Sequence, residues 1–389
     1  MTAVPFRVAL IAAVAAAGFS QQEMRPRREG GYWVDTVTGS FGLPKASRLR
    51  IDAYGPVTVR GDDSTDSVSY SLRKRVRARE MHQARELLNR FAVKVRQQGG
   101  WVLLSVSQPG GNHIAELTVT APSRIATALL ETHGGDVEAY DLDGEIHAET
   151  AGGRILMDRI LAAVSARTGG GEIRLGKIGG AVRCLSGGGA IRLDTAGGEA
   201  FLESAGGEIL VREAKGPVRA STAGGSIHVE RAWDTVTAST AGGLIDVQHA
   251  TGLVVAETSG GSIQIGAAGG VQCESAAGAI RLKGISGQVR ATTATGNILA
   301  AIPDQAQLED SFLNTGGGDV TVFLPSNVAV TVHARNESGG AGRIISDFPE
   351  IRLRGGDGRI SVAEGALNGG GPLLRIYAVR GTIYLRRQR

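Results

Sequence analysis

Hydrophobic and polar residues alternate in short segments through the middle of the chain, between about residues 126 and 323. One kind of segment reads Ile-x-Leu or Ile-x-Val, for example at Ile191, Ile227 and Ile245. The other reads Val-x-Ala-x-Thr, for example from Val218 and from Val236. Alternation places every second side chain on one face of an extended strand. The pattern predicts two kinds of short β-strand, each with one buried face.

Glycine separates these segments at a constant interval. The second glycine of a Gly-Gly pair recurs every 18 residues, at Gly135, Gly153, Gly171, Gly189, Gly207, Gly225, Gly243 and Gly261. One residue is then dropped, and the series resumes at Gly278 and Gly296. A fixed period held over ten repeats is typical of a solenoid. We therefore predict an all-β fold, a β-solenoid (β-helix) with about 18-residue coils of two short strands. Glycine is expected to supply a positive φ at the bends.

A column of hydroxyl residues keeps the same period, just before the glycine corner. Its members are Thr132, Thr150, Thr168, Ser186, Ser204, Thr222, Thr240, Thr258, Ser275 and Thr293. An exposed ladder of this kind could order water or a ligand. The alternation, however, places the hydroxyls on the same side as the inward Val and Ala. We expect them to face inward and to hydrogen-bond the bending backbone.

The segments that flank the repeats differ from them. Residues 21–40 are expected to be a linker and residues 41–125 an N-terminal β-rich cap. Helical spacing of Met81, Ala84, Leu87, Leu88 and Phe91 predicts one helix in the cap, at about residues 80–91. Regular coils are expected over 126–323, followed by irregular C-terminal coils and a cap over 324–389. Capped ends are expected because an open edge strand promotes aggregation.

The order of these motifs resembles a known family. Leu49-x-Ile51 and Gly55-x-Val57-x-Val59 come first, followed by Val119-x-Ala121-Pro122 and the Gly-Gly-x-Ile repeats. A late Gly-Asp-Val-x-Val-x-Leu-Pro spans 318–325, and Gly-x-Ile-x-Leu closes the series at 381–385. Together they resemble the bacterial putative-adhesin family of unknown function, which is related to the head GIN auto-transporter adhesin domains. The resemblance covers about residues 45–387. It implies an exported β-solenoid and brings no catalytic residues.

The first twenty residues have the pattern of a secretory signal peptide. Arg7 supplies a positive charge, an uncharged apolar run follows from Val8 to Phe19, and small residues come after it. No later segment is long and apolar enough for a membrane anchor. We therefore expect an exported protein that is periplasmic, at the cell surface or extracellular. The net charge of +4 is too small to indicate a nucleic-acid partner.

The sequence offers little for catalysis or for a metal. Solenoid enzymes of the pectate-lyase type carry clustered carboxylates on neighbouring coils. Here only Glu257 and Glu274 are neighbouring acids in the outward column. His133 and His147 lack metal-ligand spacing, and the phosphate-loop-like segment that begins at Gly171 lies inside the repeat. We expect no enzyme, no metal site and no cofactor.

Two cysteines occupy the inward column, at Cys184 and Cys273. They are five coils apart, which is about 24 Å at ~4.8 Å per coil. A disulfide requires Cα atoms within about 7 Å of each other. We expect two separate buried thiols.

The densest positive charge is a cluster in the cap: Arg73, Lys74, Arg75, Arg77 and Arg79. In an exported protein this cluster could bind an anionic envelope polymer. We favour the plainer interpretation that these five residues are outward, solvent-exposed positions of a strand and the helix after it. Interleaved aromatic residues, which support binding of single-stranded nucleic acid, are absent.

The sequence thus predicts a non-catalytic exported β-solenoid, an adhesin or cell-envelope scaffold that presents an elongated binding surface to an envelope component. Two alternatives stay open. One is a polysaccharide-active β-helix enzyme, which would need acid columns or exposed aromatic platforms on the outer face. The other is a periplasmic regulatory or sensory module.

Overall fold

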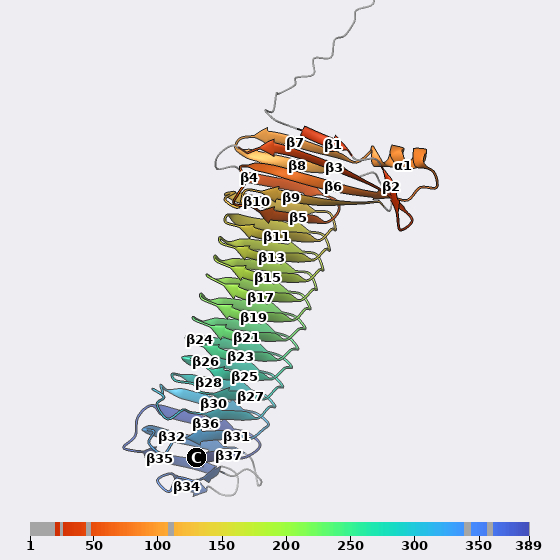
Figure 1. Ribbon diagram of the computed structural model, residues 1–389. Coiled ribbons are helices and arrows are strands. Elements are labelled where there is room, and N and C mark those ends of the chain that lie inside the picture. Colours follow the sequence, from red (N-terminus) through yellow and green to blue (C-terminus); the bar gives the residue numbers. More distant parts are fainter. Residues whose placement is uncertain are drawn as a thin grey trace, which may run out of the picture.

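The computed structural model describes residues 20–23, 26–43, 48–107, 113–337, 344–355 and 361–388. The proposed signal peptide lies outside these ranges except for Ser20, so it stays a prediction. Two long sheets, sheet A with 19 strands and sheet B with 18, form the two walls of one narrow rod. Figure 1 shows this rod with a wider cap at its N-terminal end. The predicted all-β solenoid is confirmed.

Each regular coil contributes one strand to each sheet. Sheet A contains β11 (Val137–Leu142), β13 (Ile155–Ile160), β15 (Ile173–Ile178), β17 (Ile191–Ala196), β19 (Ile209–Ala214), β21 (Ile227–Ala232), β23 (Ile245–Ala250), β25 (Ile263–Ala267), β27 (Ile280–Lys283), β29 (Ile298–Ala301) and β31 (Val320–Leu324). Sheet B contains β10 (Thr127–Thr132), β12 (Glu145–Thr150), β14 (Val164–Thr168), β16 (Val182–Ser186), β18 (Ala200–Ser204), β20 (Val218–Thr222), β22 (Val236–Thr240), β24 (Leu253–Thr258), β26 (Gly270–Ser275), β28 (Val289–Thr293) and β30 (Ser311–Thr315). Neighbouring strands are parallel, and equivalent residues of successive coils lie side by side. Ile227 pairs with Ile245, and Ile245 with Ile263.

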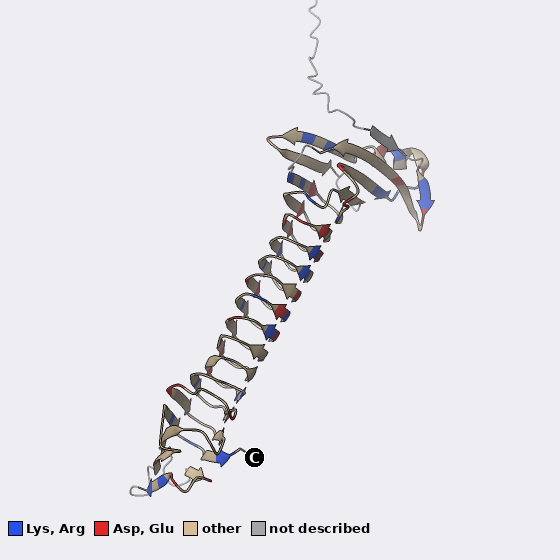
Figure 2. Ribbon diagram, turned by 60° about the vertical axis from the view of Figure 1, so that its left-hand side comes forward, with Lys and Arg blue, Asp and Glu red and all other residues tan. Residues whose placement is uncertain are grey.

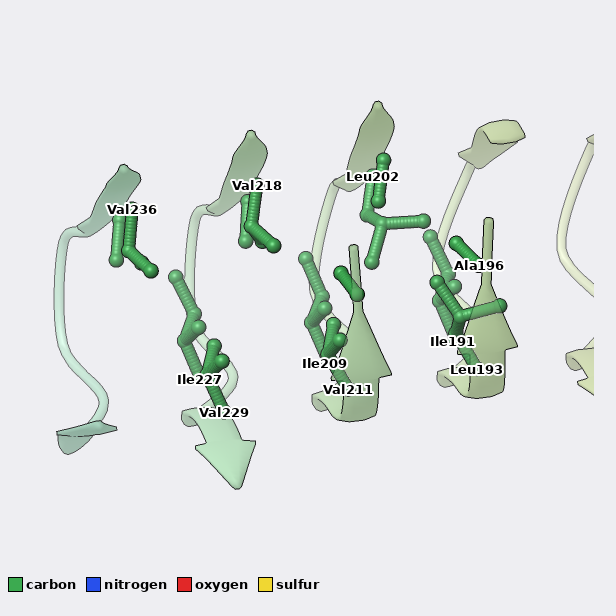
Figure 3. Packing of buried hydrophobic residues seen from close by; sticks show 14 of the residues in the cluster. Ile191, Leu193, Ala196, Leu202, Ile209, Val211, Val218, Ile227, Val229 and Val236 are labelled. Carbon is green, nitrogen blue, oxygen red and sulfur yellow. The ribbon is translucent and has the colours of Figure 1, made fainter. Parts of the chain in front are cut away.

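The core is a thin layer between the two sheets. Ile191, Ile209 and Ile227 stack in one column of sheet A, and each is fully buried. Across from them stand smaller residues of sheet B such as Val218 and Val236 (Figure 3). Because every coil is covered by the coils above and below it, the chain buries its apolar surface without large aromatic side chains.

The hydroxyl column faces inward, as predicted, and joins successive coils. Thr240 Oγ1 donates to the carbonyl oxygen of Gly225, in the preceding coil, at 2.9 Å. Thr240 Oγ1 also accepts a hydrogen bond from the backbone N–H of Gly243, in its own coil, at 3.2 Å. Both polar backbone groups of the corner are therefore satisfied inside the rod. The same pair of bonds recurs at Thr168 and Ser204.

The role expected for glycine at these bends was wrong. The second glycine of each pair does not have φ in the left-handed range. Instead, the corners of successive coils lie too close together for a side chain. A Cβ at Gly225 would lie 2.1 Å from the carbonyl oxygen of Gly207, and one at Gly243 would lie 2.0 Å from that of Gly225. Close backbone approach therefore requires these glycines.

The N-terminal cap contains further strands and the single helix of the described ranges. Its elements are β1 (Ser20–Glu23), β2 (Arg27–Glu29), β3 (Tyr32–Gly42), β4 (Arg48–Ala53), β5 (Val57–Gly61), β6 (Ser67–Val76), α1 (Met81–Leu88), β7 (Ala92–Gln98), β8 (Trp101–Ser107) and β9 (Ile114–Ala121). The coil β4–β5 stacks on β10–β11, and the later coil β8–β9 stacks on its other side. Antiparallel β6 and β3 extend sheet A beyond that coil, and β7 extends sheet B. With eight residues, α1 is too short to cross a bilayer, and the described ranges hold no helix that could.

The prediction of a linker over 21–40 was wrong for most of that segment. β3 pairs with β6 from Trp33 to Gly42. Asp35, Val37, Gly39 and Phe41 are buried on one face of β3. This alternation was present in the sequence, but Asp35 and Gly39 conceal its apolar character.

The C-terminal end does not stack in sequence order. It contains β32 (Val330–Asn336), β33 (Ile344–Ser346), β34 (Arg352–Gly355), β35 (Ser361–Leu367), β36 (Leu373–Ala378) and β37 (Ile383–Arg387). The last coil in the sequence, β36–β37, stacks directly on β30–β31. The earlier strands β32 and β33 pair with its other side, and antiparallel β35 and β34 follow. We call β36–β37 the closing coil.

Candidate binding site

The basic cluster of the cap does not form one surface. Along β6, Leu72, Lys74 and Val76 point inward and are buried, while Arg73 is exposed, as is Arg77 just after the strand. Lys74 Nζ lies 2.9 Å from the buried Asp35 carboxylate and donates to the Leu88 carbonyl oxygen at 3.5 Å. Lys74 thus connects β6, β3 and the last turn of α1. Its assignment to a polymer-binding site is corrected, because its charge is used inside the cap.

Ion pairs and ring contacts engage most of the outward cations of this cluster. Arg73 lies 2.7 Å from Glu29, and Arg75 pairs with Glu116. The Arg77 guanidinium lies 4.7 Å from the centre of the Tyr32 ring. Arg79 is exposed. Carboxylates therefore offset the charges of Arg73 and Arg75, whereas Arg77 and Arg79 keep theirs.

The outer face of sheet B carries the acidic pair singled out in the sequence. Glu257 of β24 and Glu274 of β26 are neighbours in the parallel ladder. Both are exposed, and neither has an ion-pair partner in the described part of the chain. The same column continues to Thr292 of β28 and Asn314 of β30, and then to Tyr377 of the closing coil.

Two adjoining hollows lie along this column and the neighbouring corner. The first hollow has a volume of about 670 Å³ and is lined by Glu257, Glu274 and Thr292. Small residues of the adjoining corner also line it: Ser259, Ala276, Ala294 and Gly316.

A second hollow adjoins the first at the closing coil. It has a volume of about 460 Å³ and shares Asn314 and Val379 with the first. Phe312 and Tyr377 lie in its wall with ring centres 5.6 Å apart and tilted by 46°. Arg375 is the register partner of Phe312 and also lines this hollow. We call the two hollows together the trough.

Charge is arranged differently inside and outside the trough. Along the regular coils, opposite charges are spaced one coil apart, as in Asp136–Arg154 at 2.9 Å and Asp194–Arg212 at 3.6 Å. Figure 2 shows both basic and acidic residues along one edge of the rod. A hydrogen bond from Arg159 lowers the pKa of Asp141 in this series. In the first hollow, Glu257 and Glu274 are adjacent like charges for which the described residues supply no ion-pair partner, whereas the adjacent Glu131 and Glu149 of the same column pair with Arg50 and Arg167.

The remaining residues considered in the sequence do not join this site. Cys184 and Cys273 are buried free thiols on β16 and β26, as predicted. Burial raises the pKa of Cys273 to about 12 and also raises the pKa of Cys184. His133 stacks on Tyr54 with ring centres 4.2 Å apart, and His147 lies 3.3 Å from Glu145. No group of three side chains suited to a metal occurs in the residues that the structure describes.

The sequence found the acidic end of the trough and missed its aromatic end. Phe312 and Asn314 belong to the Val-x-Ala-x-Thr type of strand, here Ser-Phe-Leu-Asn-Thr, but an insertion separates them from Thr293. Tyr377 is 63 residues beyond Asn314 in the sequence and lies directly beside it in the sheet. The strand pattern could have placed Phe312 on the outer face, whereas Tyr377 lies outside the 18-residue period and no pattern in the sequence places it beside Asn314.

Comparison with protein families gives the chain its relatives. Residues 47–343, which are more than half of the chain, match the family described as Toastrack DUF4097. The chain belongs to the Toastrack family. This match confirms the family resemblance that the ordered motifs predicted. No curated protein matches this Toastrack chain.

Several solved structures are similar to this Toastrack chain. A putative cell adhesion protein from Clostridium sporogenes has 11% identity, with 94% of this chain and 100% of that chain covered and a TM-score of 0.20. A putative adhesin from Parabacteroides distasonis has 9% identity, covering 74% and 96%, with a TM-score of 0.30. A putative adhesin from Bacteroides fragilis has 10% identity, covering 91% and 97%, with a TM-score of 0.18. Similarity at this level does not establish a shared function.

Proposed function

We propose that this protein is an exported, non-catalytic scaffold that binds an envelope or surface component through the trough. The observation that carries the proposal is the continuity of the trough, which takes side chains from β22 to the closing coil. At ~4.8 Å per coil, five steps between these strands span about 24 Å. An elongated ligand would find polar groups at regular intervals along that length.

The rigidity of the rod supports a binding role. Each coil is fixed to the next by parallel backbone pairing and by the buried hydroxyl bonds at its corner. The backbone positions of the trough residues are thereby fixed before a ligand arrives, which lowers the entropic cost of binding.

Export is tested with the chain itself. The full chain should be recovered outside the cytoplasm in a shortened form that begins near residue 21, whereas a variant with Arg7→Glu should be retained as precursor because the positive n-region is lost. N-terminal sequencing of fractionated protein provides the measurement. Cytoplasmic recovery of the complete wild-type chain would overturn the exported part of the proposal.

Catalysis on polysaccharides is the second candidate, because Glu257 and Glu274 lie together in the trough. Glycosidases place one carboxylate on each side of the scissile bond. These two instead stand side by side in one column, on one wall. We expect no release of reducing ends from neutral or acidic polysaccharides. Turnover that is lost in Glu257→Gln and kept in Glu203→Gln would favour the enzyme.

A further inference from the structure

We propose that the ligand of the trough is a neutral glycan chain, with one sugar ring stacked at Phe312 and Tyr377 and hydroxyl groups bound along Glu257, Glu274 and Asn314. This inference rests on the proposed binding role and names its substrate class.

Aromatic side chains at one end of the trough provide a stacking surface. Phe312 and Tyr377 are the neighbouring rings of the outer face, and both are partly exposed. Sugar rings present apolar C–H faces that pack on aromatic rings, while their edges carry hydroxyl groups. The tyrosine O–H adds a polar group at the rim of the same surface.

Carboxylate and amide groups at the other end suit vicinal hydroxyls. Glu257, Glu274 and Asn314 offer oxygen acceptors, and Asn314 and Thr292 also donate. Neighbouring members of the column are one coil apart, about 4.8 Å, which is close to the length of one hexose unit in an extended chain. Successive sugar units could therefore meet successive side chains.

Two other classes of ligand fit the trough less well. A peptide that adds a strand needs a free sheet edge, but β24, β26, β28 and β30 are each paired on both sides. The charged residues that line the trough are three carboxylates, Glu257, Glu274 and Glu337, and one cation, Arg375, so an acidic polymer would meet a net negative charge. A neutral glycan avoids both conflicts.

The chain supplies matched control residues on the same face of the same sheet. Phe201 of β18 occupies the column of Phe312, between Arg183 and Arg219, and is partly exposed. Glu203 occupies the column of Glu274 and is exposed. Both lie two strands before β22, where the trough begins. Substitutions at these positions change the same chemistry outside the trough.

The experiment is calorimetric titration of the mature protein with chitohexaose, cellohexaose and laminarihexaose, and with polygalacturonate as the acidic probe. We expect saturable binding of at least one neutral hexaose and none of polygalacturonate. Tyr377→Ala should weaken binding by about three- to tenfold, as expected for the loss of one aromatic contact. Glu274→Gln should also weaken it, while Phe201→Ala and Glu203→Gln should bind as the wild type does.

Thermal unfolding of each variant shows whether a loss of binding reflects a loss of folding. Phe312→Leu provides a second platform variant that retains apolar packing, so the inference stays testable if Tyr377→Ala unfolds. Preferred binding of polygalacturonate, or equal losses in the Phe201 and Glu203 controls, would overturn the inference. If no neutral hexaose binds but envelope fractions still capture the wild type and not Tyr377→Ala, the glycan assignment fails and the proposed binding role stands.

Discussion

At the scale of single residues, one corner position determines how closely the coils approach. The hydroxyl of Thr240 connects Gly225 of one coil to Gly243 of the next, and both glycines lie against the backbone of the preceding coil. A side chain at the glycine would push the coils apart and break the hydroxyl bonds. The threonine and the second glycine are therefore a structural pair, which explains why they recur together.

The first prediction concerns the two glycines of one pair. Gly225→Ala should destabilise the protein by about 1–3 kcal/mol or more, because its Cβ would overlap the Gly207 carbonyl at 2.1 Å. Gly224→Ala is the control, since its Cβ would have no atom nearer than Gly206 O at 3.9 Å. We expect that control to change stability by no more than about 0.5 kcal/mol. Urea denaturation measures both, and equal midpoints for the two variants would contradict the close-approach argument.

The second prediction concerns two threonines of strand β22. Thr240→Val keeps the shape of the side chain but leaves the Gly225 carbonyl and the Gly243 N–H without their partner. Such buried unpaired groups cost about 1–3 kcal/mol. Thr237→Val, at an exposed position of the same strand, should be neutral or slightly stabilising. A comparable loss of stability in both variants, measured by thermal unfolding, would show that the inward hydroxyl has no special role.

At the scale of elements, the cap depends on the contact between Lys74, Asp35 and the end of α1. Lys74→Met should destabilise the cap by about 3–5 kcal/mol, because it leaves the Asp35 carboxylate buried without its cation. Arg79→Met, at an exposed position nearby, should have little effect. Hydrogen exchange over 81–88 is the measurement. In the double variant Asp35→Leu with Lys74→Met, protection should return to a large extent; persistent loss would indicate that packing, not charge, is responsible.

Elements also show how far the sequence could predict the structure. The alternation of Ile227 and Val229 fixes the inward face of its strand, and 18-residue spacing fixes the neighbours of each coil. The same alternation along β6 places Lys74 inward with Leu72 and Val76, but the run of positive charge drew attention away from it. Stacking order at the ends could not be predicted, because a period identifies neighbours only while it continues. Tyr377, at the aromatic end of the trough, was missed for that reason.

At the scale of the whole molecule, the ends of the rod are closed by coils taken out of sequence order. The closing coil lies between β30–β31 and β32–β33, so the last residues of the chain hold the C-terminal cap in place. Without it, the edges of β30 and β31 would be exposed and available for pairing with other chains. The solenoid and its C-terminal cap are thus joined by the closing coil, which follows both of them in the sequence.

The final prediction tests this arrangement with Ile376→Asp in β36. Ile376 is fully buried between Leu313 and Ala334, so a carboxylate there should detach the closing coil. Because contacts in a solenoid are between neighbours, β30, β32 and β35 should lose hydrogen-exchange protection while β20 and β22 keep theirs. Exposed edges should also cause concentration-dependent association in size-exclusion chromatography. Arg375→Asp, one residue away on the outer face, should cause neither change. Uniform loss of protection along the whole rod would instead show that the coils unfold as a single cooperative unit.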